Sequence, residues 1–231
     1  STLYINGAWV ASSDGAVREI RSPHDNSVVA TVSEATAADT KDAIKAARES
    51  FDSGVYASWS MKDRCALVEK VADLIKRDAE ILAAFETRDT GKRMIETRYD
   101  MADIEATFRH FAALGLKLKD RKVDVGADNI TSVITHEPVG VCSLIGPWNY
   151  PLLQISWKAA PALVAGCSFI IKPSELSPST AIHFMKLLEE AGLPKGVANL
   201  ICGAGATAGA PLAEDPRVDL VSFTGGLITG R

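Results

Sequence analysis

The chain has 231 residues, of which 47% are hydrophobic and 23% are charged, with a formal net charge of −4 at pH 7. This composition is that of a globular protein with one large domain or two small ones. The negative net charge and the lack of a basic stripe argue against nucleic acid or an anionic membrane as a partner. Four widely spaced cysteines without a CxxC pair favour reduced thiols over a disulfide or zinc framework.

The sequence contains no recognisable targeting or membrane segment. The N-terminus, STLYINGAWV, lacks the basic start and apolar core of a signal peptide. The least charged stretch lies between Glu137 and Lys158; it contains Pro147, Asn149, Pro151 and Gln154 and is therefore a poor membrane span. We expect a cytoplasmic protein.

The first part of the chain predicts short strands followed by helices. YINGAWV reads as a hairpin with an Asn-Gly turn, and EIRSPHDNSVVATV reads as a second pair of short strands. Thr36 is the expected N-cap of a helix with Asp39 at its third position, and Ser60 and Asp63 repeat this arrangement. Two further helices are expected over DAEILAAFETRDTGK, ending at Gly91, and ETRYDMADIEATFRHFAALGLKL.

The pattern changes twice in the second half. Residues 121–140, RKVDVGADNITSVITHEPVG, alternate with period two around a Gly/Asp/Asn turn and predict a protruding β-hairpin. Four apolar runs follow, GVCSLIGP, CSFIIKP, VANLICG and VDLVSFTG, with helical segments between them. This alternation predicts a parallel sheet covered on both faces. Ligands of such sheets bind beyond the carboxyl ends of the strands, so the residues after the four runs are the candidate site.

The segment after the first run, PWNYPLLQISWK, carries four candidate side chains. Asn149 either caps the next helix, with Pro151 in its first turn, or donates its amide to an oxyanion. Tyr150 and Trp157 are two helical turns apart and form either core or two walls of a cage for a cation. Lys158, the single charge of the segment, is either a snorkelling lysine or a site residue.

The ends of the other three runs carry candidate cofactor groups. Lys172 and Glu175 stand at the sheet edge, where Glu175 either accepts from both hydroxyls of an adenine ribose or forms a surface ion pair. The turn from Gly203 to Gly209, GAGATAG, resembles a dinucleotide fingerprint with one extra residue, although a flexible turn would explain it equally well. The last run enters a glycine turn in VSFTGGLITGR, which is a common way to bind a phosphate.

Together and in this order, IGPWNYPLLQISWKAAPALVAGC, FIIKPSE, the glycine turn and VSFTGGLITGR resemble the cofactor-binding region of the NAD(P)-dependent aldehyde dehydrogenase superfamily. YINGAWV, ETRDTGK and the hairpin before EPVGV agree, so the resemblance covers essentially the whole chain. It implies an aldehyde-dehydrogenase-like α/β fold with a parallel Rossmann-type sheet, N-terminal helices and a protruding oligomerisation hairpin, incomplete at the C-terminus. The implied divisions are an N-terminal part of the cofactor-binding domain (1–120), the oligomerisation hairpin (121–140) and a Rossmann-type NAD-binding segment (141–231), without a catalytic domain.

The resemblance also implies roles for individual residues. Asn149 matches the donor that stabilises the oxyanion, and Lys158 matches a lysine described as assisting catalysis. Glu175 favours NAD, with NADP as the alternative. The implied cofactor contacts are Ile145, Pro147, Trp148, Asn149, Lys172, Ser174, Glu175, Gly205, Gly209, Phe223, Thr224, Gly225, Gly226 and Thr229.

One departure indicates a subgroup. Many family members have serine where this chain has Gly226, and the FTGG form with Tyr150 and Trp157 is similar to betaine-aldehyde and ω-amino-aldehyde dehydrogenases. In those enzymes aromatic side chains surround a trimethylammonium or amino group. The expected substrate is therefore a small quaternary-ammonium or amino aldehyde, with Tyr150 and Trp157 as the substrate residues.

Two further expectations follow from the resemblance. Some relatives bind a potassium ion, and the corresponding positions here are Ile20, Arg21 and Asp89, although Asp89 also fits a plain helix-end residue. The hairpin at 121–140 matches the element that crosses to a partner subunit, which implies a homodimer or homotetramer.

The catalytic pair of the family has no counterpart in the sequence. The mechanism needs a cysteine thiolate to attack the aldehyde and a glutamate to activate water, in GQxC-like and ELGGK-like motifs that are absent here. None of the four cysteines resembles the nucleophile. We therefore expect the N-terminal half of an aldehyde dehydrogenase, truncated, cleaved or a segment of a longer protein, which is inactive alone. The alternative is a non-catalytic nucleotide-binding or oligomer-modulating protein built from that half.

Overall fold

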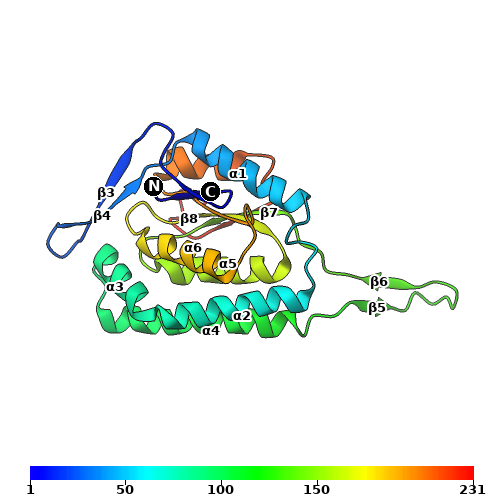
Figure 1. Ribbon diagram of the computed structural model, residues 1–231. Coiled ribbons are helices and arrows are strands. Elements are labelled where there is room, and N and C mark those ends of the chain that lie inside the picture. The colour runs from blue at the N-terminus through cyan, green and yellow to red at the C-terminus, as the bar shows by residue number, and fades with distance from the viewer.

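A mixed sheet of six strands forms the centre of the protein, whose computed structural model describes residues 1–231 (Figure 1). The strand order is β10-β7-β8-β9-β1-β2. Four parallel strands come from the four apolar runs: β7 (Val141–Ile145), β8 (Ser168–Lys172), β9 (Ala198–Leu200) and β10 (Leu220–Phe223). The parallel sheet predicted from the sequence is confirmed.

The N-terminal hairpin extends this sheet, which the sequence did not predict. Strands β1 (Leu3–Ile5) and β2 (Ala8–Val10) add antiparallel to β9. Their turn is the predicted Asn-Gly pair, with Asn6 and Gly7 both in the left-handed region at φ 51 and 78°. The buried Asn199 accepts from the Asn6 amide at 2.9 Å and donates to the Gly196 carbonyl at 2.8 Å. One buried amide thus fixes the hairpin to the parallel strands.

Helices cover both faces of the sheet and add a further layer on one side (Figure 1). α1 (Ala37–Asp52) and the short α7 (Ala210–Glu214) lie on one face, and α5 (Pro151–Ala165) and α6 (Ser179–Ala191) lie on the other. The outer layer consists of α2 (Met61–Arg77), α3 (Ala79–Thr90) and α4 (Met94–Gly115). None of these helices is long and apolar enough to cross a membrane.

The helix boundaries follow the predicted capping residues. Thr36 and Asp39 form a reciprocal capping box at the start of α1. The Ser60 hydroxyl accepts from the Asp63 amide at 3.1 Å at the start of α2. Gly91 ends α3 in the left-handed conformation, at φ 74°. Local sequence therefore determines where these helices begin and end.

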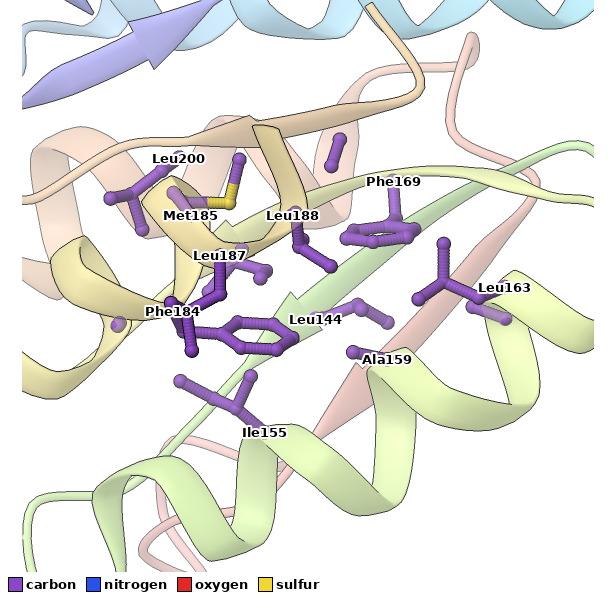
Figure 2. Packing of buried hydrophobic residues seen from close by; sticks show 14 of the residues in the cluster. Leu144, Ile155, Ala159, Leu163, Phe169, Phe184, Met185, Leu187, Leu188 and Leu200 are labelled. Atoms are coloured by element: carbon purple, nitrogen blue, oxygen red, sulfur yellow. The ribbon is translucent and has the colours of Figure 1, made fainter. Parts of the chain in front are cut away.

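The core lies between the sheet and the helices α5 and α6. Figure 2 shows Leu144 of β7 beside Phe184 of α6 and Ile155 of α5, and Phe169 of β8 nearer Leu163 of α5. All of these side chains are buried. Phe184 also contacts Phe108 of α4 edge to face, with ring centroids 5.6 Å apart. This second contact joins the outer helix layer to the core of the sheet.

Two hairpins lie outside the central sheet. β3 (Val17–Arg21) pairs with β4 (Val28–Ser33), as predicted. β5 (Arg121–Val123) and β6 (Ser132–Ile134) form the predicted hairpin that projects from the body of the molecule (Figure 1). Several of its exposed side chains are apolar: Val125, Ile130, Val133 and Ile134. An isolated two-stranded hairpin is marginally stable, so this element depends on its anchoring at both ends.

The entry to β7 is tightly packed around Asp219, the residue before β10. Its carboxylate accepts from the Val141 amide and from the Arg48 guanidinium, both at 2.7 Å. Gly140 has φ 129°, and a Cβ there would lie 1.8 Å from Asp219 Oδ2. Only glycine fits this position without displacing the carboxylate from its two donors.

We predict that Gly140→Ala lowers the free energy of unfolding by at least about 2 kcal/mol, because it adds both backbone strain and a steric clash. Gly126→Ala is the matched control, since Gly126 also has a positive φ of 73°, but a methyl group there would have no atom within 4 Å. Urea unfolding measures both. Equal losses for the two variants would contradict the role assigned to Asp219.

Candidate functional site

The strand ends come together at one edge of the sheet. In the register of the parallel strands, Ile145 lies opposite both Lys172 and Phe223. The three segments at these strand ends, PWNYP, KPSE and FTGG, therefore begin side by side. Parallel pairing alone brings together candidate residues that are distant in the sequence.

Lys158 reaches from α5 to the FTGG turn. Its ammonium donates to Thr224 Oγ1 at 2.6 Å, and the Thr224 hydroxyl lies 3.3 Å from Gln154 Oε1. Lys158 pairs with no carboxylate, and burial lowers its pKa. The side chain thus points along the sheet edge and orients the threonine of the glycine turn.

The Asn149 side chain is exposed and forms no hydrogen bond within the chain. The N-cap of α5 is Tyr150, without a side-chain cap bond, and Pro151 is the first helical residue. Of the two roles left open for Asn149, the helix cap is therefore excluded, because the helix boundary lies one residue later, at Tyr150 (φ −136°, ψ 65°). An unengaged amide at a strand end is the kind of donor that stabilises an oxyanion.

The two proposed cage residues, Tyr150 and Trp157, are exposed, so they do not belong to the core. Tyr150 is 42% exposed, and the Lys92 ammonium lies 3.8 Å from its ring centroid. Trp157 is 51% exposed and lines a shallow hollow of about 400 Å³ with α4 residues that include Asp103 and Phe111. Each aromatic ring thus has its own surroundings, and Tyr150 does not line the hollow beside Trp157.

Lys92 belongs to a buried charge network that the sequence reasoning missed. Its ammonium lies 2.5 Å from Asp100 Oδ2 and 3.7 Å from Glu86 Oε1. Glu86 is fully buried, and neither carboxylate oxygen has a hydrogen-bond partner. Burial raises the pKa of Glu86 to about 8 against the opposing attraction of Lys92. The signal in the sequence was a glutamate on the apolar side of a helix that otherwise contributes Leu82 and Ala83 to the core.

Lys172 is 3% exposed, so it does not form a surface ion pair. Its ammonium donates to the Pro173 carbonyl at 2.9 Å and lies 3.8 Å from Glu175 Oε2. Burial lowers the pKa of Lys172, whereas Glu175 partly opposes this effect. Gly209 lies over the lysine stem, where a Cβ would be 3.4 Å from Cδ. Ser174, which is also buried, accepts from the Leu176 amide and shapes the turn.

The two glycine turns differ in structure. Gly205–Gly209 forms one π-helical turn that leads into α7, and a Cβ at Gly205 would meet no atom within 4 Å. Phe223 ends β10, and Gly225, Gly226 and Thr229 follow it on the surface. A Cβ at Gly226 would meet no atom within 4 Å. The backbone at Gly226 is open to a ligand, as an anion-binding turn requires.

A cavity of about 360 Å³ joins the β3 segment to this edge. It is lined by Ile20, Arg21 and Asp89 together with Trp148 and Glu175, among others. The structure thus brings the three candidate potassium positions together, beside two candidate cofactor residues. No cluster of three or more His, Cys, Asp or Glu side chains is arranged to hold a metal ion.

Asp89 has a structural partner within the chain. Its carboxylate accepts from the Ser179 amide and hydroxyl, both at 2.9 Å. It therefore caps the start of α6 from the end of α3. Burial raises the pKa of Asp89 to about 6, although the two bonds from Ser179 oppose this shift.

All four cysteines are buried and unpaired: Cys65, Cys142, Cys167 and Cys202. Burial raises the pKa of Cys202 to about 12, which is opposite to the activation of a nucleophile. No thiol is accessible at the edge where Asn149 and Lys158 lie.

A parallel sheet between helix layers, with polar groups and glycine turns at its carboxyl edge, defines a Rossmann-type α/β protein. The family model described as "Aldehyde dehydrogenase family" matches residues 9–231, and the chain belongs to this family. The resemblance and the fold class expected from the sequence are thereby confirmed.

Individual relatives agree with this assignment. The chain is 48% identical over 230 residues to betaine aldehyde dehydrogenase of Bacillus subtilis (strain 168), covering 100% of this chain and 47% of that protein. It is 38% identical to an aldehyde dehydrogenase of Emericella nidulans, covering 99% and 46%. A crystal structure of betaine aldehyde dehydrogenase from Staphylococcus aureus in complex with NAD+ superposes with a TM-score of 0.97 at 47% identity, covering 99% and 45%. The chain thus spans about half the length of the relatives it matches.

We predict that the free energy of unfolding of the wild type decreases as the pH rises, because the buried Glu86 must ionise. Glu86→Gln should not show this decrease. The folded-state pKa of Glu86, about 8, lies above the unfolded value of 4.5, so the folded state binds the extra proton between these limits. The free energy of unfolding of the wild type should fall relative to the variant by about 3 to 4 kcal/mol from pH 5 to pH 8.

Urea unfolding at several pH values measures this difference. Glu80→Gln is the control, because Glu80 is exposed and pairs with Arg98 on the surface. Parallel pH profiles for the wild type and Glu86→Gln would show that the Glu86 carboxyl does not titrate in this range.

Proposed function

We propose that the protein is the cofactor-binding portion of a cytoplasmic, NAD-dependent aldehyde dehydrogenase that oxidises an aldehyde to the carboxylic acid through a cysteine thiohemiacetal. The observation that supports this most directly is the shared sheet edge, where Asn149, Lys158 and Glu175 follow neighbouring strands. The relatives add support, because a protein named betaine aldehyde dehydrogenase is 48% identical and a solved relative carries NAD+.

The residues of the edge fit a dinucleotide. Glu175 is partly exposed beside the buried Lys172, so its carboxylate can accept from the ribose hydroxyls, and it would repel the 2′-phosphate of NADP. The open backbone at Gly226 suits a pyrophosphate, whereas the ring of Phe223 packs against Gly225. The remaining proposed contacts surround these groups: Ile145, Pro147, Trp148, Ser174, Gly205, Gly209, Phe223, Thr224 and Thr229. When bound, the nicotinamide accepts a hydride from the substrate.

Two residues of this chain would act on the reacting aldehyde. The free amide of Asn149 is available to donate to the oxygen that becomes negative when a nucleophile adds to the carbonyl. Lys158 orients Thr224 and places a positive charge near the same edge. We assign the nucleophilic cysteine and the general-base glutamate to residues outside 1–231, because all four cysteines here are buried. Because the chain has no accessible thiol, a non-catalytic nucleotide-binding protein is the second candidate function.

For the substrate, we propose a quaternary-ammonium or amino aldehyde. Trp157 presents an exposed ring to a hollow that also contains the Asp103 carboxylate, and both groups attract a cation. Tyr150 contributes an exposed ring at the start of the same helix, with Lys92 on one of its faces. The named activity of two relatives, from Bacillus subtilis and Staphylococcus aureus, is consistent with this class.

Two accessory features complete the proposal. A potassium ion would be held by the Asp89 carboxylate and the backbone carbonyls of Ile20 and Arg21, which line one cavity, and it would supply structural charge balance there. The β5–β6 hairpin, with its exposed apolar side chains, would join two copies of the chain in a dimer or tetramer.

We predict that the purified 231-residue chain produces no NADH from aldehyde and NAD, and that it binds NAD weakly. Glu175→Ala should weaken that binding about tenfold, because the ribose loses a charge-assisted acceptor. Calorimetry measures binding and NADH fluorescence measures turnover, with Glu214→Ala on the exposed end of α7 as the control. Robust turnover by this chain would overturn the assignment of the nucleophile. Unchanged binding in Glu175→Ala would overturn the ribose contact.

A second prediction concerns the aldehyde and requires this chain together with a family catalytic half. Trp157→Ala should reduce the preference for betaine aldehyde over hexanal about tenfold in kcat/KM, because a cation–π contact is lost. Trp9→Ala is the control, since Trp9 lies on the remote hairpin β1–β2. If hexanal is preferred and Trp157→Ala leaves the ratio unchanged, the proposed substrate class is wrong.

A further inference from the structure

Glu34, at the end of the β3–β4 hairpin, makes three short contacts beside the proposed cofactor edge. Oε2 accepts from Arg18 Nε at 2.6 Å, and Oε1 accepts from Arg18 Nη2 at 2.7 Å. Oε1 also accepts from the amide of Ala204, the residue before the π-helical turn, at 2.9 Å. A single carboxylate therefore connects an arginine of β3 to the Gly205–Gly209 turn.

This pair lies next to the second pair of charges at the edge. Arg18 and Glu175 line the same cavity, and Lys172, which is 3.8 Å from Glu175, is close enough to Glu34 to help lower the pKa of its carboxyl. The bidentate contact with Arg18 is the larger cause of that lowering. Glu34 is therefore ionised, and it stands with Glu175 beside the cations of Arg18 and Lys172.

Each cation at this edge already has a carboxylate partner: Arg18 pairs with Glu34, Lys172 with Glu175, and Arg21, which lines the same cavity, with Glu19. Arg18 directs two of its donors at Glu34, and the Lys172 ammonium is buried. A phosphate on the 2′ position of an adenosine at this edge would bring further negative charge toward both Glu34 and Glu175. An adenosine with a free 2′-hydroxyl meets no such repulsion and can still donate to Glu175.

We propose that Glu34 is a specificity residue of the cofactor site, which excludes a 2′-phosphate by engaging Arg18 and by adding a second carboxylate beside Glu175. The inference rests on the proposed function, because it assumes that adenosine binds at this edge. It extends that function, because the discrimination between the two dinucleotides then depends on a residue of the β3–β4 hairpin as well as on the strand end.

The test uses Glu34→Gln, which keeps an acceptor for Ala204 and removes only the charge. The probes are 5′-AMP and adenosine 2′,5′-bisphosphate, and calorimetry on the 231-residue chain measures both dissociation constants at one fixed ionic strength. The wild type should prefer 5′-AMP. Glu34→Gln should shift the ratio about tenfold toward the bisphosphate, because one repulsive charge is gone and Arg18 becomes available.

Two other variants make the result specific. Glu80→Gln removes an equally bidentate arginine partner on the surface of α3 and should leave the ratio unchanged. Arg18→Gln should shift the ratio in the opposite direction, further against the bisphosphate. Thermal melts of each variant verify that the chain is folded.

The outcomes separate this inference from the function on which it rests. If Glu34→Gln leaves the ratio at the wild-type value, or weakens both nucleotides equally, Glu34 is only a structural link to Ala204 and the inference is wrong. If the wild type binds neither nucleotide, the assignment of this sheet edge as the cofactor site is wrong, and the inference about Glu34 is then wrong as well. If the affinity ratio shifts toward the bisphosphate in Glu34→Gln and away from it in Arg18→Gln, the result supports both the cofactor site and the role of Glu34 in specificity.

Discussion

Strands β7 and β8 are buried on both faces, and this burial determines where polar chemistry can occur. A strand covered by helices on each side carries apolar side chains along its length, so ionisable groups are placed beyond its ends. Parallel pairing then puts those ends at one edge, where Ile145 is in register with Lys172 and Phe223. The positions of Asn149, Lys158 and Glu175 all follow from this one constraint.

Buried charges occur where the layers meet this edge. Glu86 and Lys92 lie between α3, α4 and the start of α5, and Asp89 links the end of α3 to the start of α6. Lys172 lies under the π-helical turn. Removing a charge from water is costly unless partners replace the water. Asp89 has such partners on another element, the amide and hydroxyl of Ser179, whereas the Glu86 oxygens accept no hydrogen bond and burial raises the pKa of that carboxyl to about 8. Burying the Asp89 carboxylate therefore costs free energy but also fixes the end of α3 against the start of α6, close to the site.

Local patterns predicted local structure well. The capping residues Thr36 and Ser60 indicated the starts of two helices, and the apolar runs indicated all four parallel strands. At the start of α5 the sequence left two roles open for Asn149, helix cap or oxyanion donor. The structure excludes the cap, because the helix boundary lies at Tyr150, where the backbone φ is −136°. A pattern of residue types does not contain that angle.

Contacts between distant segments were beyond the reach of sequence patterns. Addition of the N-terminal hairpin to β9, the ammonium of Lys92 over Tyr150, and the link from Glu34 to Ala204 each depend on how complete elements pack. Family resemblance pointed to Glu175 and Asn149 because their motifs are contiguous. It did not point to Glu34, whose surroundings come from three separate parts of the chain.

The contacts of Asp219 also bear on the order in which the chain folds. Asp219 and the Val141 amide are 78 residues apart in the sequence, so their contact closes a long loop that contains β8, β9, α5, α6, the π-helical turn and α7. Closing such a loop has an entropic cost that is offset only when the intervening strands are already paired. We therefore expect β10 to join the sheet late. Weakening the Asp219 contacts should then speed unfolding more than it slows folding.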